Sequence, residues 1–180
     1  MPCLQKFGDC LTSIVVLYFA KVVRCIPRGR LSLLCRIDWN KHMAIHFKIF
    51  ENFNLVVSRW DGIIKTDDVI PSYKKLFEDE KWKPRFNEII DLRNAGMHEL
   101  KSEDLQQINK SIENYYEGIP INVAVIAPND LSFGMARIYE VYAYDSSECV
   151  KVFRKVHDAL NWIGMKDEEI VDYIQNNAGK

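Results

Sequence analysis

Three side chains suited to acid–base chemistry lie within eight residues of one another: Asp91, Arg93 and His98. They end or follow an apolar run, and the carboxyl ends of strands are where α/β proteins form their sites. A carboxylate, a guanidinium and an imidazole at one strand end could form an acid–base cluster. No spacing in the sequence forces them together, and such groups more often form structural ion pairs. An enzyme is therefore one hypothesis, and we expect Arg93 to pair with Asp91 or a neighbouring carboxylate.

The usual motifs for nucleotide binding and nucleophilic catalysis are missing from the sequence. It contains neither glycine-rich phosphate motif, G-x-x-x-x-G-K-[ST] or G-x-G-x-x-G, and no G-x-S-x-G. Ser72–Lys75 matches Ser-x-x-Lys by letter, but its companion motifs are missing. His42 and His46 are four residues apart, but His46 lies in an expected strand, so no expected helix presents two histidines to a metal. We therefore expect no metal, no cofactor and no enzymatic activity.

The first 42 residues differ in composition from the rest of the chain. They hold seven basic and two acidic residues, a net charge of +5, whereas residues 43–180 hold 17 basic and 23 acidic residues, a net of −6. Four of the five cysteines also fall in this segment, with no C-x-x-C pair. With only Cys149 in the remainder, no disulfide framework is available, and we expect a reducing, cytoplasmic location.

Two interpretations of residues 1–42 remain open. The apolar run Leu11–Ala20 is ten residues long, too short to span a bilayer, which takes about 20 residues. A basic, acid-poor segment with apolar residues could lie on an anionic membrane surface. Alternatively, the segment is not part of the working protein, and translation begins at Met43. Membrane association is expected only if residues 1–42 are native, and the near-neutral net charge of the whole chain argues against nucleic-acid binding.

The apolar pattern after Met43 predicts five strands. Ile45, Phe47 and Ile49 alternate with polar residues, and a short turn leads to a second strand at 55–60, so the two form a hairpin. Asp61-Gly62 is expected to end that strand. The other strands are expected at 86–92, 121–127 and 150–153. Because residues 121–127 are almost all apolar, this strand is expected in the middle of the sheet.

Helical patterns occupy the intervals between these strands. A helix starts at Thr66, although Pro71 suggests that its regular part begins later. The other expected helices and their buried residues are 102–117 with Leu105, Ile108, Ile112 and Tyr115; 131–142 with Leu131, Met135, Ile138, Tyr139 and Tyr142; 156–163; and 167–175. The order β-β-α-β-α-β-α-β-α predicts an α/β domain at 43–165 with a mixed, mostly parallel sheet and an N-terminal β-hairpin, followed by a C-terminal helix and tail at 166–180.

The stretch from Phe47 to Ile163 resembles the SpoIIAA-like branch of the STAS superfamily, the anti-sigma-factor antagonists. The segments that carry the resemblance are Leu55–Gly62, Glu88–Arg93, Val123–Pro128, Gly134–Glu140, Val152–Arg154 and Ala159–Gly164. No single segment is diagnostic, but the ordered set covers nearly all of residues 43–165. The resemblance implies a fold shared with CRAL-TRIO lipid-transfer domains.

The resemblance also implies a phosphorylated serine just after the third strand, and this chain departs from it there. The family pattern is Asp, a hydrophobic residue and Ser, whereas this chain reads Asp91-Leu92-Arg93. Arginine cannot accept a phosphate, and its fixed positive charge has the opposite sign. The phospho-switch is therefore not expected here, although Arg93 and Asn94 could meet an anion instead.

Three functional hypotheses follow. The first is a non-catalytic regulatory or interaction module that binds a protein partner or a second copy of itself. The alternative is a carrier for a lipid or another apolar small molecule, by analogy with the CRAL-TRIO relatives; the enzyme is the third. The partner or ligand surface is expected to comprise Asp91, Arg93, Asn94, His98, Asn129, Ser132 and Arg137.

Overall fold

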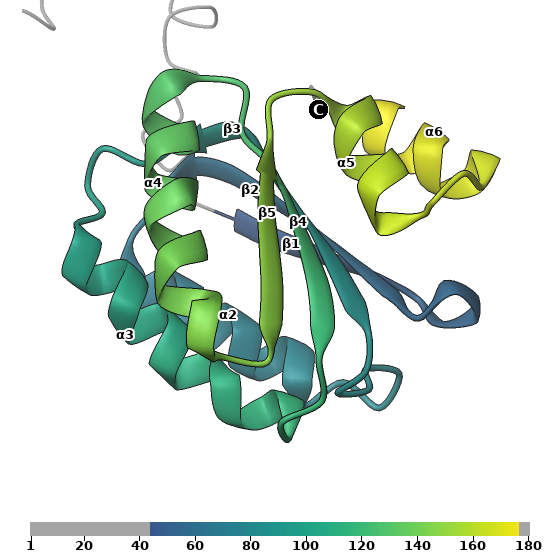
Figure 1. The fold of residues 1–180 in the computed structure, drawn as a ribbon, viewed down its shortest axis with the longest axis horizontal. Helices are drawn as coiled ribbons and strands as arrows, with labels where there is room; N and C mark the ends of the chain where they lie inside the picture. Colours follow the sequence, from purple (N-terminus) through teal and green to yellow (C-terminus); the bar gives the residue numbers. More distant parts are fainter. Residues whose placement is uncertain (1–43, 177–180) are drawn as a thin grey trace, which may run out of the picture. The chain divides into compact units, whose positions relative to one another are not determined.

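The computed structural model describes residues 44–176, which form a five-stranded sheet (Figure 1). The strand order is β1-β2-β3-β4-β5, with β1 antiparallel to β2 and all other neighbours parallel. The strands are β1 (Ala44–Phe50), β2 (Leu55–Ile63), β3 (Asn87–Gly96), β4 (Ile121–Ile126) and β5 (Glu148–Phe153). The predicted α/β class, with a mixed, mostly parallel sheet and an N-terminal hairpin, is confirmed. The predictions for the basic extension at 1–42 lie outside the described residues.

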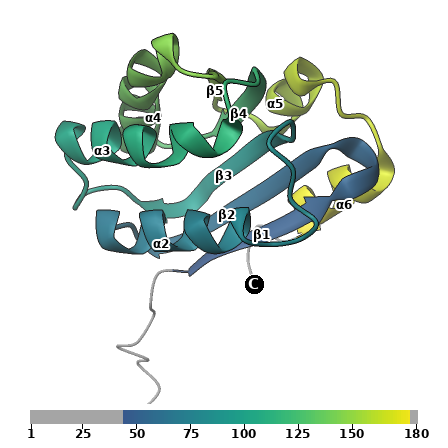
Figure 2. The ribbon, with the colours of Figure 1, turned by 90° about the horizontal axis from the view of Figure 1, so that it is seen from below.

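Helices cover both faces of the sheet (Figures 1 and 2). The helices are α2 (Thr66–Phe77), α3 (Ser102–Ile112), α4 (Asp130–Tyr142), α5 (Val156–Ile163) and α6 (Glu168–Asn176), and the short 3-10 turns are η2 (Glu51–Phe53), η3 (Glu113–Tyr116) and η4 (Ala143–Asp145). Helices α2, α3 and α4 pack on one face, which we call the three-helix face. Helices α5 and α6 pack on the other.

The period-two pattern of the strands explains why two cores form. On the central strand β4, Val123 and Val125 face the three-helix layer, whereas Ala124 and Ile126 face α5 and α6. All four side chains are buried. A strand covered on both faces must be apolar on both, as the sequence of this segment predicted.

Strands β2 and β3 extend beyond the ends predicted from the sequence, which were residues 60 and 92. Asp61 and Asn94 were expected to lie at strand ends, but they pair with each other after a bulge, and the ladder continues to Ile63 and Gly96. The Asn94 side-chain amide donates to the Asp61 carboxylate at 2.9 Å. The cross-strand partner therefore overrides the local turn preference.

Two details of the helix predictions are wrong. Helix α2 is regular from Thr66 and contains Pro71, so it does not begin later. After α3 the chain tightens into the 3-10 turn η3, which has three residues per turn in place of 3.6. The change of period buries Tyr116 and leaves Tyr115 exposed, where the helical pattern predicted the reverse.

Candidate functional site

Asp91 and Arg93 form a structural ion pair that ties β3 to the C-terminal helix. The Arg93 guanidinium donates to both carboxylate oxygens of Asp91, at 2.9 Å from Nε to Oδ1 and 2.7 Å from Nη2 to Oδ2. Nη2 also donates to the carbonyl of Ile174 in α6. Asp91 is buried at 3% exposure. The ion pair expected from the sequence is therefore confirmed, and the guanidinium already has acceptors within the chain.

The neighbouring polar groups at this end of the sheet are also engaged with one another. Arg59 donates to Asp61 at 2.8 Å, and Asp61 accepts from Asn94 as well. His98 is exposed in the loop after β3 and is a partner of neither Asp91 nor Arg93 among the contacts of residues 44–176. The structure therefore joins two members of the suggested acid–base cluster and leaves out the third.

The three predicted surface residues on or beside α4 have local roles. The Asn129 side chain caps the helix by accepting from the Ser132 backbone N–H at 2.8 Å. Ser132 is buried, and its hydroxyl lies 3.4 Å from the Ala95 carbonyl. Arg137 is exposed and pairs with Glu140 one turn along, at 2.5 Å. These interactions position α4, and Asn129 and Arg137 remain exposed.

Two buried glutamates on the three-helix face were not among the residues predicted from the sequence. Glu88 on β3 accepts hydrogen bonds from the Ser58 hydroxyl at 2.5 Å and the Tyr73 hydroxyl at 2.8 Å. Glu148 on β5 accepts from the Tyr139 hydroxyl at 2.6 Å and the Asn109 amide at 3.3 Å. Neither carboxylate has a cationic partner among the described residues.

The two glutamates connect each helix of the three-helix face to the sheet. Tyr73 belongs to α2, Asn109 to α3 and Tyr139 to α4. Burial raises the pKa of Glu88 and of Glu148 from 4.5 to about 7, and the hydrogen bonds that each carboxylate accepts oppose the shift. The charge of Glu88 raises the pKa of Glu148 further. The two carboxylates are therefore hydrogen-bonded only by uncharged hydroxyl and amide groups, and with a pKa of about 7 each changes its charge near neutral pH.

The sequence did contain a signal for this network. Glu88 shares its strand face with Ile90 and Leu92, and Glu148 shares its face with Val150 and Val152. Charged residues are almost never fully buried unless they have partners. A glutamate at an inward register position of an apolar strand thus predicts polar partners on the covering helices.

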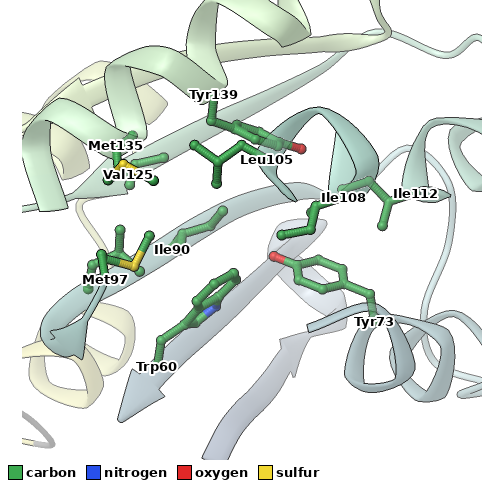
Figure 3. A pocket seen from close by; sticks show the side chains of 12 residues that line it. Trp60, Tyr73, Ile90, Met97, Leu105, Ile108, Ile112, Val125, Met135 and Tyr139 are labelled. Carbon is green, nitrogen blue, oxygen red and sulfur yellow. The ribbon is translucent and has the colours of Figure 1, made fainter. Parts of the chain in front are cut away.

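A small apolar cavity lies between the sheet and helices α3 and α4 (Figure 3). Its volume is about 40 Å³, whereas sites for small-molecule ligands usually occupy about 300–1,000 Å³. Met97, Met135 and Ile90 are among its lining residues. Trp60 also lines it, and its buried Nε1 has no hydrogen-bond partner among the described residues. A space of this size gives the lipid-carrier interpretation no support.

The outer side of α4 carries an exposed apolar stripe that continues into η4. It consists of Leu131, Ile138, Val141 and Tyr144, which are 50%, 37%, 71% and 86% exposed; we call it the α4 stripe. The prediction that Leu131 and Ile138 belong to the buried side is wrong. The small residues Ser132 and Ala136 face the sheet with Met135 and Tyr139, so the buried side is rotated from the one expected.

Two other classes of site are absent from residues 44–176. No helix there is long and apolar enough to cross a membrane. No group of three or more His, Cys, Asp or Glu side chains in that range is arranged to hold a metal ion.

No family model matches the chain, and no curated protein is similar to it. A solved structure of an uncharacterised DUF3478-family protein from Shewanella loihica PV-4, described as having a SpoIIAA-like fold, is similar to this chain. The sequence identity is 17%, the match covers 67% of this chain and 93% of that one, and the TM-score is 0.44.

Proposed function

We propose that the chain is a non-catalytic protein-interaction module whose contact surface is the α4 stripe. The observation that carries this proposal is the exposure of four large apolar side chains on α4 and the adjoining turn η4. Of the seven large apolar residues exposed within residues 44–176, four lie on α4 and η4. Single exposed apolar residues are ordinary, but a group of them on one surface is typical of a binding site.

The inner side of α4 supports the same proposal because it holds the helix in a fixed position. Tyr139 bonds Glu148, Tyr142 lies 2.6 Å from the Ser102 hydroxyl, and Asn129 caps the first turn. A surface that is already ordered loses little conformational entropy on binding. The stripe is thus presented on a rigid support.

The chemistry of the surface indicates what kind of partner it fits. Val141 and Tyr144 are the most exposed members, and the charged pair Arg137–Glu140 lies beside them on the same helix. Interfaces commonly have an apolar centre and a polar rim. We expect a partner protein with an apolar patch bordered by charges. A regulatory role for the contact rests on the STAS resemblance, and with Arg93 in place of the serine such regulation would not use phosphorylation at that position.

The proposal is tested by affinity capture from the native host with matched variants. The double variant Ile138→Asp/Val141→Asp places two charges in the stripe, whereas Ile119→Asp changes an apolar residue of similar exposure outside α4. A protein recovered with the wild type and with Ile119→Asp, but not with the double variant, is then purified and its affinity measured by calorimetry. A loss of about tenfold or more in the double variant supports the proposal, since polar replacement at an interface centre is costly. Equal recovery with all three proteins would contradict it.

A further inference from the structure

The buried acids Glu88 and Glu148 together contact all three helices of the three-helix face. Their exposed fractions are only 2% and 4%. Glu88 accepts a hydrogen bond from Tyr73 of α2. Glu148 accepts hydrogen bonds from Asn109 of α3 and Tyr139 of α4. The charge state of these two carboxyl groups therefore affects how every helix of this face packs on the sheet.

The donors to each carboxyl group converge on one of its two oxygens. Ser58 and Tyr73 both donate to Oε1 of Glu88. The two donors to Glu148 likewise share its Oε2. A protonated carboxyl group holds its proton on one oxygen and still accepts hydrogen bonds at the other. All four hydrogen bonds can therefore persist when both glutamates are protonated.

The groups around the two glutamates do not compensate a negative charge there. Tyr73 and Tyr116 interact electrostatically with Glu88, and Tyr116, Tyr139 and Glu113 with Glu148. Burial raises the pKa of the three tyrosines well above its usual value, so they stay neutral near pH 7. No salt bridge within residues 44–176 includes either glutamate. Ionisation therefore places uncompensated charge beneath the helices, which is costly in an apolar interior.

The small apolar cavity adjoins both sets of hydrogen bonds (Figure 3). Tyr73 and Tyr139, which donate to the two glutamates, both line it. The cavity volume is about 40 Å³, and one water molecule needs about 10–15 Å³. Trp60 lines it as well, with a buried Nε1 that lacks a hydrogen-bond partner among the described residues. Water can therefore be accommodated next to the donors of the two carboxyl groups.

We propose that Glu88 and Glu148 form a pH-dependent latch, which holds α2, α3 and α4 on the sheet while both carboxyl groups are protonated and lets the helices separate locally from the sheet when they ionise. Separation brings water to the carboxylates, and water stabilises their charge. Helices α5 and α6 lie on the other face and take no part. The latch does not depend on the function proposed above, whereas any effect of it on binding at the α4 stripe rests on that function.

The latch opens as the pH rises. In the closed state the pKa of each glutamate is about 7, and in a hydrated open state it returns toward 4.5. Between these values the open state binds fewer protons, so a higher pH favours it. For one carboxyl group with these two pKa values, the opening constant rises about tenfold between pH 6 and pH 8. For two carboxyl groups exposed together, the rise is about a hundredfold.

The test is amide hydrogen exchange of the full chain at pH 6 and pH 8, corrected for the intrinsic pH dependence of exchange. We expect protection in the three helices to fall about a hundredfold, and the Trp60 indole N–H to lose protection with them. At pH 8, low urea should leave this exchange unchanged, because local opening exposes little surface. Amides of the central strand β4 should respond to urea, since they exchange by global unfolding. If the helices matched β4 in protection and urea dependence at both pH values, they would separate only on complete unfolding, and the proposal would be overturned.

Glutamine variants assign the opening to the two carboxyl groups, because glutamine resembles a protonated glutamate and cannot ionise. Glu88→Gln and Glu148→Gln should each reduce the change in protection between pH 6 and pH 8 from about a hundredfold to about tenfold, and the double variant should remove it. Glu103→Gln, which changes an exposed residue of α3, should keep the wild-type change. The full wild-type change in both single variants would overturn the proposal. If the double variant does not fold, the two single variants and the wild type still decide.

Discussion

The outer side of α4 differs from the polar cluster at the carboxyl ends of β2 and β3. They differ in how many of their side chains have partners within the chain. The cluster consists of Arg59, Asp61, Asp91, Arg93 and Asn94. At the cluster, Arg93 pairs with Asp91, and Asp61 accepts from both Arg59 and Asn94. On α4 and η4, Val141 and Tyr144 remain mostly exposed. Polar residues at a strand end are thus a poor guide to function when neighbours within the chain already bind them. We therefore place the proposed contact surface on the uncovered apolar side chains of the well-anchored helix α4.

The largest effect should follow from breaking the cluster. Arg93→Ala leaves the buried Asp91 carboxylate without its cation and removes the bond to Ile174 in α6. We expect a loss of about 3–5 kcal/mol in the free energy of unfolding, as for other buried pairs with one partner removed. Urea unfolding measures it.

Arg137 is the control, and it tests whether the loss of stability in Arg93→Ala comes from the burial of the ion pair. Arg137 pairs with Glu140 at the surface, so Arg137→Ala should change stability by less than about 1 kcal/mol. If the two variants unfold at the same urea concentration, the Asp91–Arg93 pair does not stabilise the fold more than a surface ion pair.

The next effect concerns the glutamates beneath the helices and depends on pH. With the pKa of Glu88 and Glu148 raised from 4.5 to about 7, the folded chain binds more protons than the unfolded chain in this window. Stability is then highest below the unfolded value and falls as pH rises toward and through about 7. Each shift corresponds to about 3 kcal/mol at most. Glu88→Gln and Glu148→Gln cannot ionise, so each should reduce this loss.

The measurement is the free energy of unfolding across that pH range for the wild type, each glutamine variant and Glu103→Gln, which changes an exposed residue of α3. Parallel curves for the wild type and the two buried variants would mean that the carboxylates do not titrate as described.

A smaller effect is expected on the inner side of α4. Tyr139→Phe removes the hydroxyl that donates to Glu148, and this bond opposes the upward shift of the Glu148 pKa. We expect the pKa of Glu148 to rise further and stability at neutral pH to fall by about 1–2 kcal/mol. Carboxyl carbon NMR follows the titration. Tyr142→Phe, which removes the contact with Ser102, should leave the Glu148 pKa unchanged; a shift in both variants would argue against a direct role of Tyr139.

The smallest effect on stability is expected at the α4 stripe. Val141 is 71% exposed, so Val141→Asp should change the free energy of unfolding by less than about 0.5 kcal/mol. Ala136→Asp, on the buried side of the same helix, should destabilise the chain strongly because it buries a charge. Thermal unfolding compares the two. Strong destabilisation by Val141→Asp would mean that this residue is part of the core.

The sequence predicted the architecture because local periodicity and the order of elements carry that information. The alternation of Ile45, Phe47 and Ile49 and the apolar stretch at β4 placed their strands correctly. The end of α5 at Gly164, which has a positive φ of 78°, was also predicted. The boundaries of β2 and β3 were not, because Asp61 and Asn94 depend on each other across the sheet.

For the candidate surface, the structure adds partners that the sequence does not show. Residue type alone indicated Asn129, Ser132 and Arg137, but whether a polar group is free depends on neighbours that folding brings together. The α4 stripe depends on the rotation of one helix against the sheet. Helix α4 has apolar residues on two sides, so its sequence fits more than one rotation about the helix axis. The side that contains the small residues Ser132 and Ala136 is the one that is buried.

We propose that the chain acts by contact through the outer side of α4. The most direct measurement is photo-crosslinking in the native host with a benzoylphenylalanine placed at Val141 or at Asn94, both of which are exposed. We expect a discrete adduct with one protein from position 141, lost when Ile138→Asp is added, and no such adduct from position 94. An adduct from position 94 alone, or from neither position, would contradict it.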